Sequence, residues 1–263
     1  MIAGLSQLEP VTGGCIHRCY RALKDGRPVF LKTNTADHAD GFAAEADGLR
    51  ALRVAGCTAP EPLAHGVSGK EAYLLMEFLE LQPRGDFAAL GRMLAAVHRS
   101  TGASFGWERD NSIGSTPQLN TPCENWARFW RERRMAPQLA LARSKGFDIE
   151  LGRACELLEG HEPQPALVHG DLWGGNAAFL RGGAPVLFDP AVYYGDREVD
   201  LAMTELFGGF PAEFYSGYGA MPAGYDTRKH LYNLYHLLNH LNLFGAGYLG
   251  QVTSTLRLLA RAL

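Results

Sequence analysis

The chain has 263 residues, of which 46% are hydrophobic and 20% are charged, so it is long enough for one large domain or for two lobes around a cleft. Its formal net charge is −3 and no run of lysine and arginine occurs, which argues against a nucleic-acid partner. The five cysteines are odd in number and lack C-x-x-C spacing, which argues against a disulfide framework and a zinc site.

The first 80 residues are predicted to form a small sheet that carries one helix. Residues 15–32 predict two short strands around a polar turn, in which Asp25-Gly26 supplies the reversal. Residues 38–55 place apolar side chains along one face and predict a helix, and Pro60 and Pro62 end this unit. The run EAYLLMEFLEL then predicts a buried strand that leads into a linker.

From residue 85 onward the pattern is mostly helical, and residues 81–263 are expected to form the larger unit. The N-terminus lacks a basic segment followed by a long apolar one, and no stretch has the length and apolarity of a membrane span. Together with the cysteine pattern, this favours the cytoplasm. Helices are predicted at 87–100, 123–143, 198–207 and 228–249, with a loop at 102–122 and short strands at 166–189.

The most informative segment is ALVHGDLWGGNAAFLRGGAPVLFDP, residues 166–190. Its apolar runs AAFL and PVLF flank a turn that contains Gly-Gly, which predicts a β-hairpin. Asn176 precedes the first strand and Asp189 follows the second, so their side chains should meet at the open end of an antiparallel pair. Asp171 lies on the loop that leads to the same end. These oxygen donors suit Mg²⁺.

The spacing of these residues agrees with that of kinases. Asp171 and Asn176 are five positions apart, as are the catalytic Asp and the metal-binding Asn of the kinase catalytic loop. Asp189 stands where the second metal ligand belongs, although Pro190 replaces the usual Phe. We therefore expect Asp171 to accept a hydroxyl proton, and Asn176 and Asp189 to hold Mg²⁺. His169 is expected to pack the loop and to bond a backbone carbonyl.

The N-terminal half contains residues that suit the phosphates of ATP. Lys32 ends the strand VFLK, as the phosphate-pairing lysine of kinases does. Glu45 lies on the following helix and can pair with Lys32. Gly13 and Gly14 precede the first strand and would let backbone N–H groups approach phosphate oxygens.

Three further assignments concern the adenine, the acceptor and a cysteine. The backbone of Glu77, Phe78 and Leu79 is expected to form the inter-lobe hinge and to bond adenine. Trp173 lies inside the catalytic loop, where it would either stack on a sugar or brace the loop. Cys15 follows two glycines whose N–H groups would favour its thiolate, so a redox role is one hypothesis and a small buried side chain is the other.

Through nearly its whole length the chain resembles the fructosamine/ketosamine kinase family, within the aminoglycoside-phosphotransferase-like branch of the kinase fold. The motifs that carry the resemblance are GGCI (13–16), FLK (30–32), FAAE (42–45), IGSTPQ (113–118), FWRERR (129–134), PQL (137–139), HGDLWGGN (169–176), FDPAVYYGDREVDLAM (188–203) and YHLLNHLNLFG (235–245).

The resemblance implies a bilobal α+β fold of the protein-kinase type, with an N-lobe at 1–80 and a C-lobe at 81–263. It also implies ATP- and Mg²⁺-dependent phosphorylation of a sugar hydroxyl on a ketosamine, a glycation adduct from which the amine is then recovered. In this family the residues at the positions of Asp171, Asn176 and Asp189 would be the base and the metal ligands, and Lys32 with Glu45 would hold the phosphates.

Three alternative functions stay open. The first is a kinase for another small hydroxyl compound, such as an aminoglycoside. The second is a metal-dependent phosphoesterase, although its usual D-x-H motif is missing. The third is a catalytically silent kinase-fold binding protein. The partner expected is a small ketosamine or glycated amine, and both a monomer and a homodimer fit the sequence.

Overall fold

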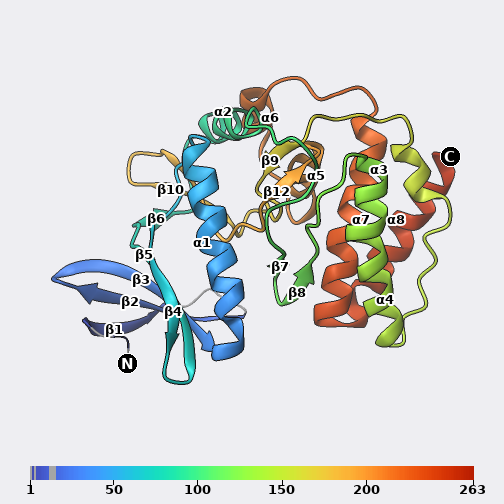
Figure 1. The fold of residues 1–263 in the computed structure, drawn as a ribbon. Coiled ribbons are helices and arrows are strands. Elements are labelled where there is room, and N and C mark those ends of the chain that lie inside the picture. The colour runs from blue at the N-terminus through green and yellow to red at the C-terminus, as the bar shows by residue number, and fades with distance from the viewer. Residues whose placement is uncertain (1, 3, 12–15) are drawn as a thin grey trace.

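The computed structural model describes residues 2, 4–11 and 16–263. Its N-terminal part is a five-stranded antiparallel sheet with one long helix against it (Figure 1). The helix α1 contacts β4 and β5, and its Leu49 and Leu52 share a core with Leu74 of the sheet. The strand order is β1 (Leu5–Val11), β2 (Arg18–Lys24), β3 (Arg27–Thr35), β5 (Glu71–Glu77) and β4 (Pro62–Ser68), and α1 is Ala39–Val54.

The predicted hairpin and helix of this lobe are confirmed. Asp25 and Gly26 both have positive φ angles and join β2 to β3 as a two-residue turn. Two strands were not predicted: β1 contains Pro10 and β4 begins at Pro62. Both lie at an edge of the sheet, where a proline is tolerated, so Pro62 begins a strand although it was expected only to end the preceding unit.

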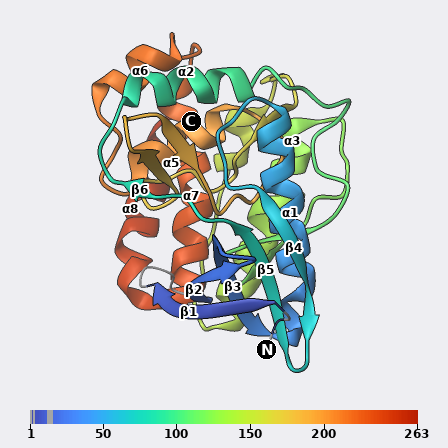
Figure 2. The same ribbon diagram turned by 90° about the vertical axis from the view of Figure 1, so that its left-hand side faces the viewer.

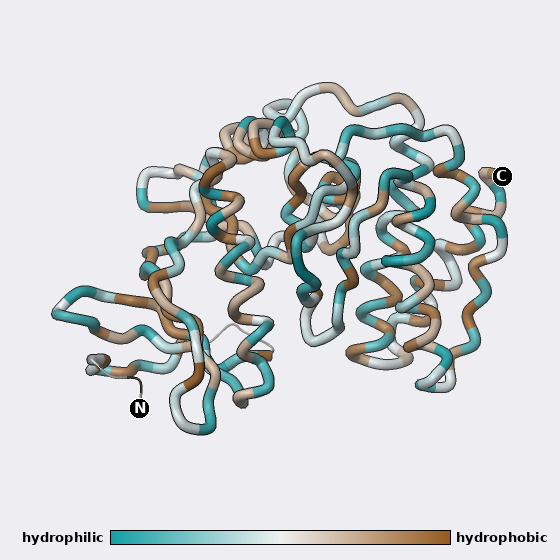
Figure 3. Tube along the Cα trace, viewed as in Figure 1, coloured by the Kyte–Doolittle hydropathy of each residue, from teal (hydrophilic) through white to brown (hydrophobic). Residues whose placement is uncertain are grey.

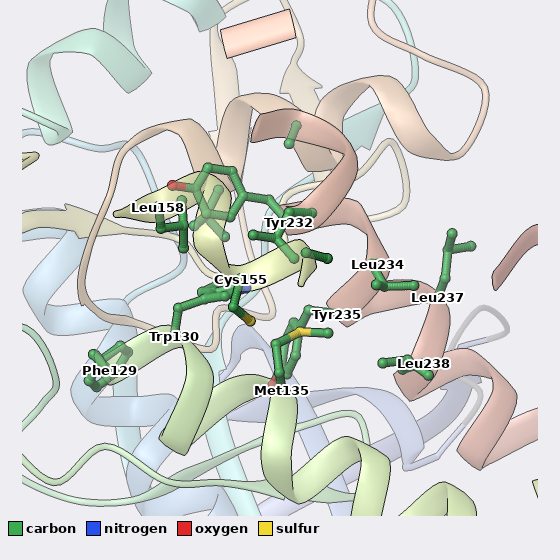
Figure 4. Packing of buried hydrophobic residues seen from close by; sticks show 14 of the residues in the cluster. Phe129, Trp130, Met135, Cys155, Leu158, Tyr232, Leu234, Tyr235, Leu237 and Leu238 are labelled. Atoms are coloured by element: carbon green, nitrogen blue, oxygen red, sulfur yellow. The ribbon is translucent and has the colours of Figure 1, made fainter. Parts of the chain in front are cut away.

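The C-terminal part consists mostly of helices, whose hydrophobic and hydrophilic residues alternate along the chain (Figure 3). Its main core lies between α3, the π-helical segment after it and α7, where Trp130 packs against Tyr232 (Figure 4). The helices are α2 (Phe87–Val97), α3 (Trp126–Phe129), the π-helix Trp130–Met135, α4 (Ala136–Ser144), α5 (Glu198–Leu206), α6 (Ala212–Tyr218), α7 (Tyr225–Phe244) and α8 (Leu249–Arg261). Short 3₁₀ turns occur at Ala154–Leu158 and Ala246–Tyr248, and another, Ala36–His38, precedes α1 in the N-terminal part.

Three small sheets lie outside the five-stranded sheet. The predicted hairpin at 177–187 is confirmed, and its first strand also pairs with the segment that leaves the N-terminal sheet. A second hairpin lies inside the segment that was predicted to be a loop, residues 102–122. The strands are β6 (Leu81–Gln82) with β10 (Ala177–Leu180) and β11 (Pro185–Leu187), β9 (Ala166–Val168) with β12 (Tyr193–Gly195), and β7 (Asn111–Ile113) with β8 (Thr116–Gln118).

The arrangement places the N-terminal sheet on one side of the molecule and the helices α3, α4, α7 and α8 on the other (Figures 1 and 2). Strands β9 and β12 lie between them, and β10 lies beside β6 on the side of the N-terminal sheet (Figure 1). Among the described residues, none of the helices combines the length and the apolarity that a bilayer span requires. The division of the chain at residue 80 stays a prediction.

Candidate active site

The loop from His169 to Asn176 leaves β9 and enters β10 at the centre of the molecule. Gly170 has a φ of +80°, and a Cβ there would lie 2.2 Å from the carbonyl oxygen of Ala191, so a glycine is required. At the end of the loop, the buried Asn176 donates from Nδ2 to the Asp171 carboxylate at 3.0 Å and to the Asp171 carbonyl at 2.8 Å. The five-residue spacing therefore brings these two side chains into direct contact.

A buried carboxylate on α5 holds the start of this loop. Asp200 accepts hydrogen bonds from the N–H of His169 at 2.7 Å and of Gly170 at 2.8 Å, and lies 3.0 Å from Nε2 of His98. His98 in turn lies 2.8 Å from the Tyr218 hydroxyl. Burial alone would raise the pKa of Asp200, but the hydrogen bond and charge of His98 outweigh it and leave the pKa below its usual value. Asp200 therefore anchors the loop as an ionised group.

His169 is a structural member of the loop. Its Nε2 lies 3.0 Å from the carbonyl oxygen of Phe188 and must carry the proton, while Nδ1 accepts from the N–H of Asp171 at 3.3 Å. Burial lowers the pKa of His169, which keeps the ring neutral. The prediction that it packs the loop and bonds a backbone carbonyl is confirmed.

Asp171 has the electrostatic properties of a general base. Burial raises its pKa, the hydrogen bond from Asn176 opposes that rise, and the negative charges of Asp189 and Asp200 add to it, so the pKa reaches about 7. A base is most effective when its pKa lies near the working pH, because it is then both ionised and basic.

Lys32 joins the sheet to the end of the hairpin. Its Nζ lies 2.7 Å from Oε1 of Glu45 on α1 and 2.5 Å from Oδ1 of Asp189 after β11. Burial would lower the pKa of Lys32, but the charges and hydrogen bonds of the two carboxylates raise it above its usual value. Lys32 is therefore a fixed cation at the point where the two parts of the chain meet.

The residues predicted to hold a divalent cation fit that role. Asn176 and the Asp189 segment are tied together, because the N–H of Phe188 donates to the Asn176 carbonyl at 3.1 Å. Since Nδ2 of Asn176 is bonded to Asp171, its Oδ1 is left as the donor for a metal, and Oδ2 is left on Asp189 beside the oxygen that Lys32 holds. An amide and a carboxylate oxygen form a donor set that Mg²⁺ prefers.

The predicted hinge residues and the predicted acceptor residue Trp173 have contacts of their own. The N–H of Glu77 donates to the Glu61 carbonyl at 2.8 Å, and adenine binding by the backbone of Glu77, Phe78 and Leu79 stays a prediction. The Trp173 side chain is 39% exposed. Its ring also meets that of Phe207 edge-on, with 6.2 Å between the centroids.

A surface cavity of about 420 Å³ opens near the catalytic loop. Phe210 in its wall approaches Gly174, since a Cβ on that glycine would lie 4.0 Å from the Phe210 ring. The cavity is lined by Glu205, Gly209, Phe210, Tyr215, Met221, Tyr225 and Asp226.

Gly13, Gly14 and Cys15 lie outside the described residues. The sequence patterns gave His98 no role, because it is a lone histidine at the end of α2 and its link to Asp200 spans about a hundred positions. Gln118 and Asn111 were likewise not singled out as individual residues, although Gln118 belongs to the motif IGSTPQ.

A sequence model of a family described as fructosamine kinase matches residues 3–262. The "Probable ketoamine kinase" of Synechocystis sp. is 47% identical over 96% of this chain and 90% of that protein. The "Protein-ribulosamine 3-kinase, chloroplastic" of Arabidopsis thaliana is 40% identical over 93% of this chain and 79% of that protein.

Solved structures agree with these matches. A crystal structure provisionally named fructosamine-3-kinase, from Haemophilus somnus 129PT, superimposes with a TM-score of 0.91 at 28% identity, over 97% of this chain and 91% of that one. A mutant of aminoglycoside phosphotransferase APH(4)-Ia, in complex with ADP and hygromycin B, superimposes with a TM-score of 0.65 at 17% identity, over 97% and 94% of the two chains. The second likeness shows the fold alone.

Proposed function

The chain belongs to the fructosamine kinase family, and from that premise we propose that it transfers the γ-phosphoryl group of ATP to a sugar hydroxyl of a ketosamine. The observation that carries the proposal is the meeting of Lys32, Asp171, Asn176 and Asp189 from three separate elements. This set is the one that kinases use to align ATP, a cation and a hydroxyl.

Asp171 is the base in this proposal. Its carboxylate, oriented by Asn176, accepts a hydrogen bond from the sugar hydroxyl and takes its proton as the oxygen bonds to phosphorus. The bond from the γ-phosphorus to the bridging oxygen breaks, and ADP leaves with the electron pair. The products are a sugar phosphate, ADP and one proton, which Asp171 releases.

Lys32, Asn176 and Asp189 hold the other reactant. Lys32, fixed by Glu45, would pair with phosphate oxygens and neutralise their charge. Asn176 and Asp189 would hold Mg²⁺, which when bound would supply positive charge to neutralise the phosphates. Rate enhancement would then come mainly from alignment and from electrostatic stabilisation of a transition state with spread charge.

The remaining contacts to ATP are assigned by position. We propose that the backbone of Glu77, Phe78 and Leu79 bonds adenine, and that the N–H groups of Gly13 and Gly14 bind the phosphates, as the sequence predicts. The sugar of the acceptor would stack on the exposed face of Trp173, because an aromatic ring suits the apolar face of a sugar. The cavity that Phe210 lines would then receive the amine portion of the acceptor.

The proposal is tested by an acceptor screen with purified protein, ATP and Mg²⁺. Fructosyl-lysine, ribulosyl-lysine, the aminoglycosides and a control without acceptor are compared by ADP release and by the mass of the acceptor. We expect ADP and a phosphorylated ketosamine in equal amounts, and no product after chelation of the divalent cation. Transfer to aminoglycosides but not to ketosamines would refute the proposed acceptor class. A cytoplasmic location and the oligomeric state stay predictions.

A further inference from the structure

The β7–β8 hairpin holds the chain segment that follows Asp189. Gln118 at the end of β8 donates from Nε2 to the Ala191 carbonyl at 3.1 Å and to Oδ1 of Asn111 at 2.8 Å. Asn111, directly opposite in β7, donates from Nδ2 to the Val192 carbonyl at 2.8 Å. Two consecutive carbonyl groups are therefore held by two paired amide side chains of one hairpin.

The orientation of the Gln118 amide is determined by its neighbours. Oε1 accepts the hydroxyl hydrogen of Tyr235 on α7 at 2.8 Å, and both hydrogens of Nε2 are used by acceptors. A reversed amide would set its oxygen against the oxygens of Ala191 and Asn111. Gln118 is 1% exposed, so water cannot replace a lost hydrogen bond, and each lost partner leaves a buried polar group unsatisfied.

The segment that Gln118 holds contains an unfavourable backbone conformation. Asp189 has a φ of +56°, a region that residues other than glycine rarely adopt. The residue before a proline also prefers an extended conformation, and Pro190 follows Asp189. Left free, Asp189 would relax toward the extended region and its carboxylate would leave Lys32. The surrounding structure must therefore fix the chain on both sides of it.

Hydrogen bonds to the backbone fix the chain both before and after Asp189. Before Asp189, the N–H of Phe188 donates to Asn176 of the catalytic loop. After it, the N–H of Ala191 donates to the His169 carbonyl at 2.9 Å, while the Ala191 carbonyl is held by Gln118. The catalytic loop thus holds the chain on both sides of Asp189, and the β7–β8 hairpin holds it in addition after Asp189.

We propose that Gln118 is a positioning residue for the phosphoryl transfer: through Ala191, and with Asn111 on Val192, it keeps Asp189 in the conformation that presents its carboxylate to Lys32 and to the cation. The inference rests on the proposed function, since it assigns a role to the metal-binding segment of that site. Because the Tyr235 hydroxyl on α7 donates to the Gln118 amide, the C-terminal core also helps to fix the conformation of this segment.

The test measures nucleotide binding rather than activity. The dissociation constant of the non-hydrolysable ATP analogue AMP-PNP is determined by calorimetry with and without Mg²⁺, for the wild type and for Gln118→Leu. Asn242→Leu is the matched control, because Asn242 is equally buried but bonds the carbonyl and the side chain of Gln138 between α7 and α4. Hydrogen exchange of residues 188–195 in the nucleotide-free protein gives a second readout.

We expect Gln118→Leu to reduce the affinity gain from Mg²⁺ by about tenfold, which is the effect of losing one or two buried hydrogen bonds. Metal-free binding should change by much less, and exchange at 188–195 should rise. Asn242→Leu should leave both the gain and the exchange of that segment as in the wild type. Equal effects of the two variants on the affinity gain would overturn the inference.

Asn111→Ala provides the test if Gln118→Leu does not fold. It removes the bond to Val192 from a less buried side chain, and it should reduce the Mg²⁺-dependent gain by a smaller factor in the same direction. An unchanged gain in Asn111→Ala would then overturn the inference. A wild type that binds AMP-PNP with no gain from Mg²⁺ would instead contradict the proposed function itself.

Discussion

Replacing Asp171 by asparagine should make the folded protein more stable while it removes the base. The pKa of this carboxyl rises from its ordinary 3.8 to about 7, because partial burial disfavours its charged form and the negative charges of Asp189 and Asp200 add to that rise. Above this pKa, the ionised Asp171 carboxylate lowers the free energy of unfolding by at most ~4 kcal/mol, at about 1.4 kcal/mol for each unit by which the pKa is raised. Asp171 is only partly buried, so solvent screens part of that cost and we expect a gain of about 1–2 kcal/mol.

The sign of the pH dependence follows from the raised pKa. Between pH 4 and pH 7 the folded state keeps a proton on Asp171 that the unfolded chain has released, so the free energy of unfolding of the wild type falls as the pH rises through this window. Asparagine has no such proton. The advantage of Asp171→Asn should therefore grow from pH 5 to pH 7 and level off above it.

The assay is chemical denaturation of nucleotide-free protein between pH 5 and pH 8. Asp148→Asn controls for the loss of one negative charge, because the side chain of Asp148 is 80% exposed. A stability difference between wild type and Asp171→Asn that is absent, or that does not change with pH, would refute the electrostatic account of Asp171.

Three further predictions concern rate and stability. The kcat/KM for the acceptor should fall as the pH drops below about 7, because protonated Asp171 cannot accept a proton; a flat rate–pH profile from pH 6 to pH 8 would contradict this. Lys32→Met should lower kcat by at least about a hundredfold in steady-state assays, since Glu45 and Asp189 lose their shared cation; near-normal kcat would exclude a role for Lys32 in transfer. Asp200→Leu should lower the free energy of unfolding by about 3–5 kcal/mol in denaturant titrations, because two loop N–H groups and His98 lose their buried partner; a change below about 1 kcal/mol would contradict the anchoring role.

Local spacing predicted the centre of the site well. The hairpin at 177–187 follows from apolar runs that flank a glycine turn, and antiparallel pairing then places Asn176 and Asp189 at one end. The link between Lys32 and Glu45 follows from a strand and a helix that are adjacent in sequence. These features depend on short-range rules that hold irrespective of the rest of the fold.

The supports of the site depend instead on contacts between distant parts of the chain. His98 reaches Asp200 from a helix about a hundred positions away, and Tyr235 reaches Gln118 across 117 positions. Nothing in the local pattern links His98 to Asp200 or Tyr235 to Gln118. The conformation of Asp189 is likewise imposed by its surroundings, since a residue before proline would be predicted to be extended.

The most direct test of the central claim is a single-turnover reaction of the enzyme with ATP, Mg²⁺ and fructosyl-lysine, followed by mass spectrometry of the acceptor. Wild-type protein should add one phosphoryl group to the sugar. Asp171→Asn should slow that step by at least about a thousandfold and should still bind AMP-PNP with Mg²⁺. Phosphorylation at an unchanged rate in the variant, or release of free phosphate in place of a modified acceptor, would contradict the claim that Asp171 is the base of a ketosamine kinase.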